Sequence, residues 1–296
     1  MSVDFSQLSK PNIIEEIDFE TLYSQRKENL IALYNTEDQS DIRETLSRES
    51  EPLVKFLQEN SYREVLLRNR INQAALSTLL AFAEKTDLDA VVANYGITRL
   101  LISPATSDLD AVYESDDALR YRASLVFDSL SVAGPTSAYE FHALTSDGRV
   151  SDAKASSPSP AEALVTILQN DTQTGEATPE LISIVEKYLS DDIRRPVGDR
   201  LKVQSVEAIH FELVATVYTN NLPESDSLVQ ASKVAIQNYF NESRRIGRSI
   251  YLSKIYNLLH VSGVVHVAIS SPQSDVEILS TQVANCTNIT INAGEV

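Results

Sequence analysis

Side chains that commonly carry out catalysis or bind metal ions are few in this sequence, which has four histidines and one cysteine among 296 residues. Histidine is the usual acid, base or metal ligand near neutral pH. His260 and His266 lie on either side of Gly263, but their spacing does not match the helical H-E-x-x-H zinc motif. His142 and His210 stand apart from them. We interpret all four as exposed or hydrogen-bonded histidines, and keep a metal-dependent hydrolase that uses His260, His266 and nearby acids as a rival hypothesis.

Motifs for nucleophilic catalysis and for nucleotide binding do not occur in the sequence. Cys286 has no second cysteine to complete a redox or zinc motif, and the G-x-S-x-G elbow of serine hydrolases is missing. The eight glycines form neither G-x-G-x-x-G nor G-x-x-x-x-G-K, the loops that wrap phosphate groups closely. We therefore expect no nucleophilic enzyme and no nucleotide cofactor.

Acidic residues are abundant, with 42 Asp and Glu, but their pairs do not indicate acid–base catalysis. Such catalysis needs two carboxyl groups with separated pKa values in one cleft, and adjacency in the sequence shows neither. Asp116-Asp117 fits the first turn of a helix, and Asp191-Asp192 fits a helix end. The sequence therefore predicts no catalytic residue, no cofactor and no metal ligand.

The overall charge is strongly negative, because 42 acidic and 25 basic side chains give a formal net charge of −17. This charge repels phosphate backbones and anionic lipid headgroups, so we expect no nucleic-acid partner. The basic cluster Arg244-Arg245 with Arg248 fits a solvated helix end. Apolar stretches such as Val261–Ile269 are too short to cross a bilayer, and Met1–Phe5 does not resemble the start of a signal peptide. We expect neither a membrane span nor export by that route, and a single cysteine suits a reducing cytoplasm.

The first third of the chain is predicted to be helical. Apolar residues recur at helical spacing over Asp18–Tyr34, and Asp18 can cap this helix by accepting hydrogen bonds from its first turn. A second helical run covers about Gln39 to Ala83. Pro52 does not fit inside a helix, so we expect either a kink or a new helix of about 30 residues with Ser50 as its N-cap.

The second half of this run has an apolar and a polar side. The apolar ridge, with a recurrence of four residues, consists of Leu67, Ile71, Ala75 and Leu79. On the polar side, Glu64 and Arg68 form an i,i+4 pair. A helix of this length either packs along its own subunit or reaches a neighbouring one.

We expect one face of this helix, within Glu49–Arg70, to bind partner proteins, because aromatic residues and arginine are enriched at the centres of interfaces. The candidate interface residues are Leu53, Phe56, Tyr62, Arg63 and Arg70. The alternative is that these side chains belong to the core of this chain. Replacing Phe56 and Tyr62 with Asp would then unfold the protein instead of releasing its partners.

After a linker at Ser103–Asp108, short helices alternate with short strands. The predicted helices are Ser115–Phe127, Ser137–Leu144, Pro179 to about Asp191 with Thr178 as its cap, Ser227–Glu242, and Leu252–His260. The predicted strands are Val150–Ala155, Ala163–Leu168, Lys202–Gln204, Ile209–Tyr218 and Val264–Ile269. Apolar and polar residues alternate along Ile209–Tyr218, which predicts a half-buried strand, and Asn220–Ser225 is predicted to be a turn.

Two stretches of the chain resemble each other. Ser137–Pro158 and Ser253–Pro272 each combine a predicted helix, a glycine turn, a strand and a Ser-Pro pair, so either one unit was duplicated or the match is chance. We predict an α+β protein with a helical N-terminal region followed by two small α+β modules. The predicted domains are the helical region 1–102, a central α+β domain 103–205 and a C-terminal α+β domain 206–296.

An ordered series of motifs runs along nearly the whole chain. The longest is the helical segment Glu49–Glu64. The others are Leu130–Gly134, Asp147–Val150, Ser157–Ala161, Arg195–Arg200, and Ile255-Tyr256 ahead of Gly263-Val264. In type and order these motifs resemble the baseplate assembly protein J family of contractile-tailed phages.

The resemblance implies a structural wedge subunit of a contractile tail baseplate, made and assembled in the host cytoplasm, and not an enzyme. In that family, two copies per wedge associate with a smaller partner protein through a helical bundle. The wedges close a ring around the hub and spike, close to the sheath, and the ring opens on contraction. Related wedge proteins occur in contractile bacteriocins and type VI secretion systems, so that origin stays open. A self-contained ligand-binding module is the remaining hypothesis.

Overall fold

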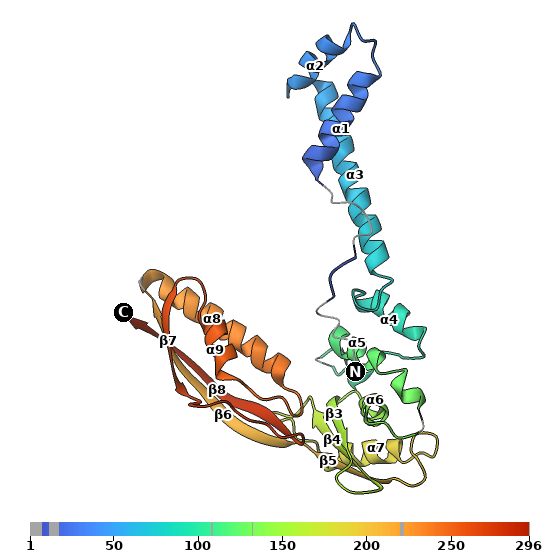
Figure 1. The fold of residues 1–296 in the computed structure, drawn as a ribbon, viewed down its shortest axis with the longest axis vertical. Helices are drawn as coiled ribbons and strands as arrows, with labels where there is room; N and C mark the ends of the chain where they lie inside the picture. Colours follow the sequence, from blue (N-terminus) through green and yellow to red (C-terminus); the bar gives the residue numbers. More distant parts are fainter. Residues whose placement is uncertain (1–7, 12–17, 108, 132, 220–221, 296) are drawn as a thin grey trace. The chain divides into compact units, whose positions relative to one another are not determined.

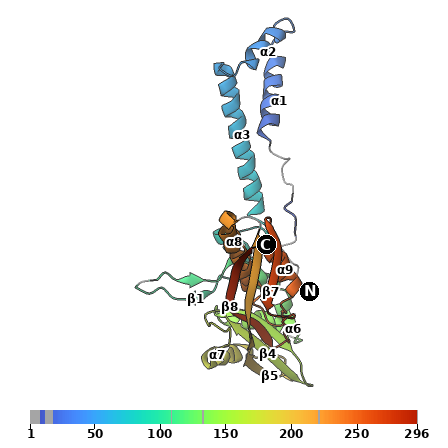
Figure 2. The same ribbon diagram turned by 90° about the vertical axis from the view of Figure 1, so that its left-hand side faces the viewer.

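The computed structural model describes residues 8–11, 18–107, 109–131, 133–219 and 222–295 (Figure 1 and Figure 2). Its internal contacts divide the chain into a first unit, Met1–Thr98, and a second unit, Arg99–Val296, and each is considered by itself. Within the described residues the first unit is helical, and the second combines helices with three small sheets. The predicted α+β class with a helical N-terminal region is confirmed.

The first unit is built around one long helix. Its described helices are α1 (Phe19–Ala32), α2 (Gln39–Ser47), α3 (Pro52–Leu76) and α4 (Lys85–Ala93). The predicted cap of α1 is confirmed, because the Thr21 amide donates a 2.9 Å hydrogen bond to Oδ2 of Asp18. Figure 1 and Figure 2 both show α1 lying along α3. α4 lies within the predicted helical region, but no separate helix was predicted at its residues.

The start of α3 differs from the prediction in its capping residue. The N-cap is Glu51, not Ser50, and Glu51 makes no side-chain capping bond. Pro52 occupies the first helical position, where its missing N–H costs nothing, and it forces an extended backbone on the residue before it. A new helix therefore begins at Pro52, as one of the two predicted alternatives requires.

The end of α3 also differs, because the helix stops at Leu76 instead of continuing towards Ala83. The hydroxyl groups of Ser77 and Thr78 donate hydrogen bonds of 3.0 Å and 2.8 Å to backbone carbonyls three residues back, which competes with further helical bonds. The 25 residues of α3 span about 37 Å, less than the length that was expected.

The core of the first unit lies between α1, α2 and α3. Its buried residues are Tyr23, Ile31, Leu46, Val54 and Leu57. At the edge of this core, Glu64 of α3 accepts hydrogen bonds of 2.5 Å from Arg26 of α1 and from Arg68, which confirms the predicted Glu64–Arg68 pair. The bonds from Arg26 and then Arg68 hold the pKa of the Glu64 carboxyl below its usual range, so Glu64 stays ionised.

The second unit begins with a short antiparallel pair of strands followed by helices. These elements are β1 (Leu101–Ser103), β2 (Val112–Tyr113), α5 (Asp116–Ser124), the 3-10 turn η2 (Asp128–Leu130) and α6 (Thr136–Ser146). Ser115 caps α5, because its Oγ accepts a 3.3 Å hydrogen bond from the Ala118 amide. The predicted linker Ser103–Asp108 starts at the end of β1 and leads towards β2, and Asp108 lies outside the described residues.

A central sheet follows, with strand order β3-β4-β5. Its elements are β3 (Val150–Ser156), β4 (Glu162–Gln169), α7 (Pro179–Leu189) and β5 (Arg200–Ser205). β3 and β4 are antiparallel, and β4 and β5 are parallel. The three predicted strands and the predicted helix are confirmed with slightly shifted ends, and Thr178 caps α7 by accepting from the Leu181 amide at 3.4 Å.

The C-terminal sheet has the order β7-β6-β8. Its elements are β6 (Glu207–Thr219), α8 (Leu222–Ser243), α9 (Leu252–Leu259), β7 (Val264–Ser271) and β8 (Gln282–Glu295). β6 is antiparallel to β7 and parallel to β8. Both helices lie on the same face of the sheet (Figure 1), where Leu213, Ala215 and Val217 of β6 are fully buried. The predicted half-buried strand at Ile209–Tyr218 is confirmed.

Two predictions in this region were wrong or incomplete. The turn at Asn220–Ser225 is wrong from Leu222 onward, because α8 already begins there and a proline is tolerated in a first helical turn; Asn220 lies outside the described residues. The strand β8 was not predicted, although Ile289 and Ile291 alternate with polar neighbours in its second half. Backbone pairing with β6 along its whole length stabilises it.

The two similar stretches of sequence form similar local structures. Ser137–Pro158 contains α6 and β3, and Ser253–Pro272 contains α9 and β7. Both strands are the antiparallel edge of a three-stranded sheet, but β3 comes before its central strand in the chain and β7 comes after. The duplication, and the division of the chain into 1–102, 103–205 and 206–296, stay predictions.

Candidate partner-binding surface

One side of α3 carries large apolar side chains that face solvent. Phe56 and Leu67 are each 62% exposed, Ile71 is 54% exposed and Leu53 is 36% exposed. At about 100° per residue, these four side chains lie within about 60° of one another around the helix. We call Leu53, Phe56, Leu67 and Ile71 the apolar stripe. Leu53 and Phe56 are separated from Leu67 and Ile71 by about three helical turns, with Asn60 on the same side between them, so the stripe consists of two exposed apolar groups.

The side of α3 that the first unit uses for its own core lies about 100° around the helix from the apolar stripe. Val54 and Leu57 are 1% and 8% exposed and pack against α1 and α2. Ser61 is also buried, and its hydroxyl donates a 2.8 Å hydrogen bond to the Leu57 carbonyl, so no polar atom of this side chain is left unpaired. The two sides of one helix therefore have different environments.

The predicted interface residues are all exposed, but they do not share one face. Leu53 and Phe56 belong to the apolar stripe, and Arg63 and Arg70 lie within about 40° of Phe56 around the helix. Tyr62, six residues after Phe56, lies about 120° away from it. The prediction therefore combined residues from two sides of α3.

A row of charges separates these two sides. Arg63 is ion-paired with Glu59 one turn earlier, and Arg70 continues the row. Beyond it, Tyr62 and Leu66 are 57% and 50% exposed and form a smaller second apolar area. The sequence had placed Leu67 and Ile71 on an apolar ridge without assigning them to the interface, because i+4 spacing alone does not tell which side of a helix is covered.

The histidines of the second unit are held by local contacts. His142 on α6 is half-buried beside Phe141, and burial, followed by the charge of Arg194, lowers its pKa and favours the neutral ring. Nδ1 of His210 on β6 lies 3.0 Å from Nδ2 of Asn285 on β8.

His260 and His266, the residues of the rival hypothesis, lie on different elements. His260 is the C-cap of α9, whereas His266 on β7 lies beside Tyr218 with ring centroids 5.5 Å apart. Among the residues that the structure describes, no three His, Cys, Asp or Glu side chains are grouped so that they could hold a metal ion. In the same part of the chain, none of the helices has the length and apolar character needed to cross a membrane.

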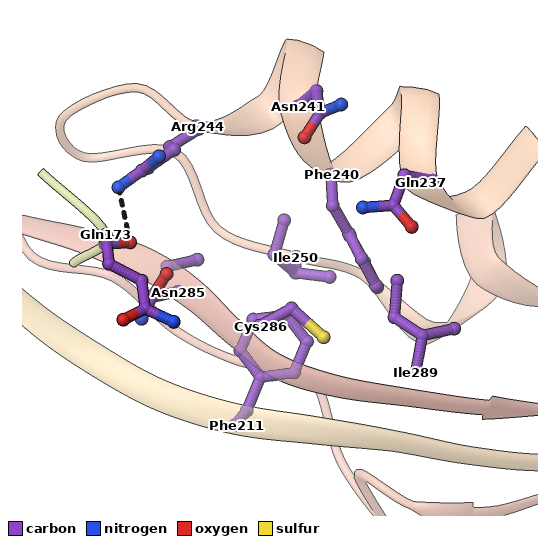
Figure 3. A pocket seen from close by; sticks show the side chains of 11 residues that line it. Gln173, Phe211, Gln237, Phe240, Asn241, Arg244, Ile250, Asn285, Cys286 and Ile289 are labelled. Carbon is purple, nitrogen blue, oxygen red and sulfur yellow. Dashed lines mark hydrogen bonds between the residues drawn. The ribbon is translucent and has the colours of Figure 1, made fainter. Parts of the chain in front are cut away.

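A cavity of about 160 Å³ lies beside α8, β6 and β8 (Figure 3). Its apolar wall includes Phe211 and Phe240, whose rings meet edge to face with centroids 5.3 Å apart. Amide side chains and Arg244 form the polar part of the wall. Nη2 of Arg244 already donates hydrogen bonds of 3.0 Å and 2.8 Å to the Thr172 and Gln173 carbonyls. Burial raises the pKa of the Cys286 thiol, which keeps it protonated and poorly nucleophilic at neutral pH. The cavity therefore offers no activated group for catalysis.

A buried ion pair fixes the beginning of the second unit. Nη2 of Arg122 on α5 lies 2.8 Å from Oε2 of Glu114, and their side chains are 3% and 9% exposed. Glu114 also accepts from the Leu100 amide at 3.2 Å, and its carbonyl accepts from Arg99 at 2.6 Å. These charged groups are paired with one another and with the backbone inside the protein, so their role is structural.

Comparison with known proteins bears on all three parts of the chain. Residues 49–106 match the model of the Baseplate J-like N-terminal domain, residues 131–205 that of the Baseplate J-like central domain, and residues 213–292 that of the Baseplate J-like protein C-terminal domain. Baseplate protein J of Escherichia phage P2 is 41% identical over 296 residues, which cover 99% of this chain and 98% of that protein. The chain belongs to the Baseplate J-like family.

The resemblance seen in the sequence motifs is thereby confirmed, and the N-terminal match begins at residue 49, where the motif Glu49–Glu64 begins. As a Baseplate J-like protein, the chain has a structural role in a phage tail baseplate. The apolar stripe falls within the match to the N-terminal domain.

Proposed function

We propose that this Baseplate J-like protein is a wedge subunit of a contractile tail, and that it joins its neighbours through the apolar stripe on α3. The observation that carries the proposal is the contrast within one helix, with Leu57 only 8% exposed and Phe56 62% exposed. A soluble chain that leaves a row of large apolar side chains in water gains free energy when another helix covers them, at roughly 25 cal/mol for each Å² removed from water.

The partner of the stripe is a second copy of this chain together with a smaller wedge protein, in a shared helical bundle. Long helices with one apolar side pack in this way, because each buries its exposed row against the next. The charges of Arg63 and Arg70 at the edge of the stripe then fix the register of the contact rather than its strength. In this proposal two copies enter each wedge, and the wedges form a ring around the hub and spike within the virion.

The proposed domains 1–102, 103–205 and 206–296 have different binding roles in such a ring. The helical region supplies the bundle, and the two α+β domains supply separate surfaces for neighbouring wedges, as heterologous ring contacts require. Assembly takes place in the host cytoplasm, where a formal charge of −17 keeps unassembled subunits apart.

Incorporation into particles tests the proposal. A phage that lacks its own copy of the gene is complemented with the unchanged chain, with Phe56→Asp/Leu67→Asp, or with Tyr62→Asp/Leu66→Asp. We expect the stripe variant to be at least about tenfold depleted from purified tails by immunoblotting, because two buried charges oppose the contact. The second pair, on the other side of the helix, should have a smaller effect.

Lys55→Asp is the matched control for the stripe variant, since Lys55 is an exposed residue of α3 that lies about 100° or more around the helix from each residue of the stripe. Circular dichroism and thermal unfolding of the purified variants establish that each remains folded. Normal incorporation of a folded stripe variant would show that the wedge contact lies elsewhere on the molecule.

The alternative is an equivalent wedge component of a contractile bacteriocin or of a type VI-like injection machine. The particles themselves distinguish these cases. Mass spectrometry of purified particles that contain this chain should find capsid proteins in a phage and tail proteins alone in a bacteriocin, and only the phage particles should contain nuclease-protected DNA.

A further inference from the structure

A short segment after α8 connects the two sheets of the second unit. We call Arg244–Gly247 the joint segment. The Ile246 amide donates a 2.8 Å hydrogen bond to Oδ2 of Asp152, which lies on β3 of the central sheet. Asp152 is only 7% exposed, and Ile246 is 5% exposed. A backbone amide of the C-terminal part of the unit is thus satisfied inside the central part by a buried carboxylate.

A second contact joins the joint segment to the connection that follows β4. Nη2 of Arg244 donates to the carbonyls of Thr172 and Gln173, in this connection. Figure 3 shows the bond to Gln173. Gly175 lies close to this guanidinium. A Cβ atom at Gly175 would lie 3.3 Å from Nη2 of Arg244 and only 2.5 Å from Cδ1 of Leu168, so a larger residue would not fit there. The φ angle of Gly175, +87°, also favours glycine. The loop therefore fits closely around Arg244.

A cation–π contact and an apolar cluster complete the connection. The Arg245 guanidinium lies over the Tyr121 ring, 5.0 Å from its centroid. Ile246 forms a buried cluster whose other members are Leu168, Val206 and Val283. Val206 is itself the one residue between β5 and β6, so the covalent link between the sheets is part of the same cluster.

We propose that the joint segment, held by Asp152, Thr172 and Gln173, fastens the C-terminal sheet to the central sheet so that the two move as one rigid body when the baseplate rearranges. The contacts come from α5, β3 and the connection after β4, so they resist rotation about the short link at Val206. A hinge needs a few residues that can change their backbone angles freely, and this link is buried and surrounded. Rearrangement then takes place outside this connection.

A distance measurement between the two sheets tests the proposal in the full chain. Spin labels are attached at Lys187→Cys on α7 and Lys254→Cys on α9, both exposed positions, with Cys286 replaced by Ser. Pulsed electron spin resonance should give one narrow distance distribution. Asp152→Ala/Arg244→Ala should broaden it at least about twofold, because the buried amide of Ile246 and two carbonyls lose their partners.

Asp152→Asn is the matched control, since its side-chain oxygen can still accept from Ile246, and it should keep the narrow distribution. A broad distribution in the unchanged chain, or an equally narrow one in the double variant, would overturn the proposal. If the double variant does not fold, hydrogen exchange of the unchanged chain decides. Amides 244–248 should exchange as slowly as those of β4, and exchange about tenfold faster or more would contradict a rigid connection.

Discussion

Helix α3 of the first unit and the interior of the second unit place apolar and charged side chains in opposite environments. In the first unit, large apolar residues of α3 face water, and ion pairs such as Arg63–Glu59 lie on the surface. In the second unit, charged groups such as Asp152 and the Arg122–Glu114 pair are buried and bonded within the protein. An exposed apolar row gains its stabilisation only when a partner arrives, whereas a buried charge is already matched and fixes the geometry of the chain that contains it.

The largest expected loss of stability comes from removing one partner of the buried ion pair in the second unit. Arg122→Ala leaves the Glu114 carboxylate buried without its cation, and should lower the free energy of unfolding by about 3–5 kcal/mol. Urea denaturation followed by circular dichroism measures the change. The control is Arg43→Ala, which removes an ion pair with Glu28 whose side chains are 58% and 56% exposed and should alter stability little. Similar losses for both variants would contradict the contrast.

A pair of substitutions one residue apart sharpens the comparison within α3. Leu57→Ala removes a side chain from the core of the first unit and should cost about 2–4 kcal/mol. Phe56→Ala removes a larger side chain from the solvent side and should change the free energy of unfolding by less than about 0.5 kcal/mol. Thermal unfolding of the purified chain distinguishes them. A large loss for Phe56→Ala would place this ring in the core of the chain.

A smaller effect is expected at the cap of α7. Thr178→Ala removes the acceptor for the Leu181 amide and should cost about 1 kcal/mol, while Thr178→Ser keeps the hydroxyl and should cost much less. Chemical denaturation of the three proteins measures both values. Equal losses would mean that the methyl group of Thr178, and not its hydroxyl, stabilises this end of the helix.

The smallest effect is a dependence of stability on pH. Burial raises the pKa of the Asp152 carboxyl, against the opposing effects of the Ile246 amide and Arg245. The other titratable or charged groups that act on it or share its surroundings are Tyr121, Glu140 and Lys154. Between the ordinary pKa of an unfolded Asp, about 3.9, and this raised value, the folded chain binds the proton more tightly than the unfolded chain. This contribution to stability is therefore largest at low pH and is lost as pH rises through the folded pKa.

Asp152→Asn isolates that contribution, because the other carboxyl groups titrate in both proteins. The free energy of unfolding of Asp152→Asn, relative to the unchanged chain, should rise with pH across this window and level off above it. Urea denaturation at a series of pH values measures the difference. A difference that stays constant with pH would show that Asp152 does not titrate differently in the folded and unfolded chains.

Features that depend on neighbours in the sequence were predictable. Asp18 and Thr178 cap their helices because acceptor and donor are three residues apart, and the alternation along Ile209–Tyr218 identifies a strand with one covered face. The apolar positions of α3 were also visible. Which of its sides α1 covers was not, so Tyr62 and Phe56 were assigned to one interface although they lie on different sides.

Features that depend on distant parts of the chain were not predictable. β8 pairs in parallel with β6, a distant strand that the residues of β8 alone do not identify, although Ile289 and Ile291 alternate with polar neighbours. The contact between Asp152 and Ile246 joins residues 94 positions apart. Arg244 and Arg245 were interpreted as a solvated helix end, since a basic pair at that place in the sequence does not reveal the carbonyls and the aromatic ring that receive it.

The single buried residue between β5 and β6 limits how this chain can be cut or extended. Proteases cut, and inserted sequences are tolerated, at positions that are exposed and have few hydrogen bonds. Val206 is instead 2% exposed, and its amide donates a hydrogen bond to the Ile167 carbonyl. A peptide tag placed at this position would have to pull Val206 out of its cluster. Fragments that end or begin there would each expose apolar surface that the other normally covers, so the second unit is best expressed and labelled as a whole.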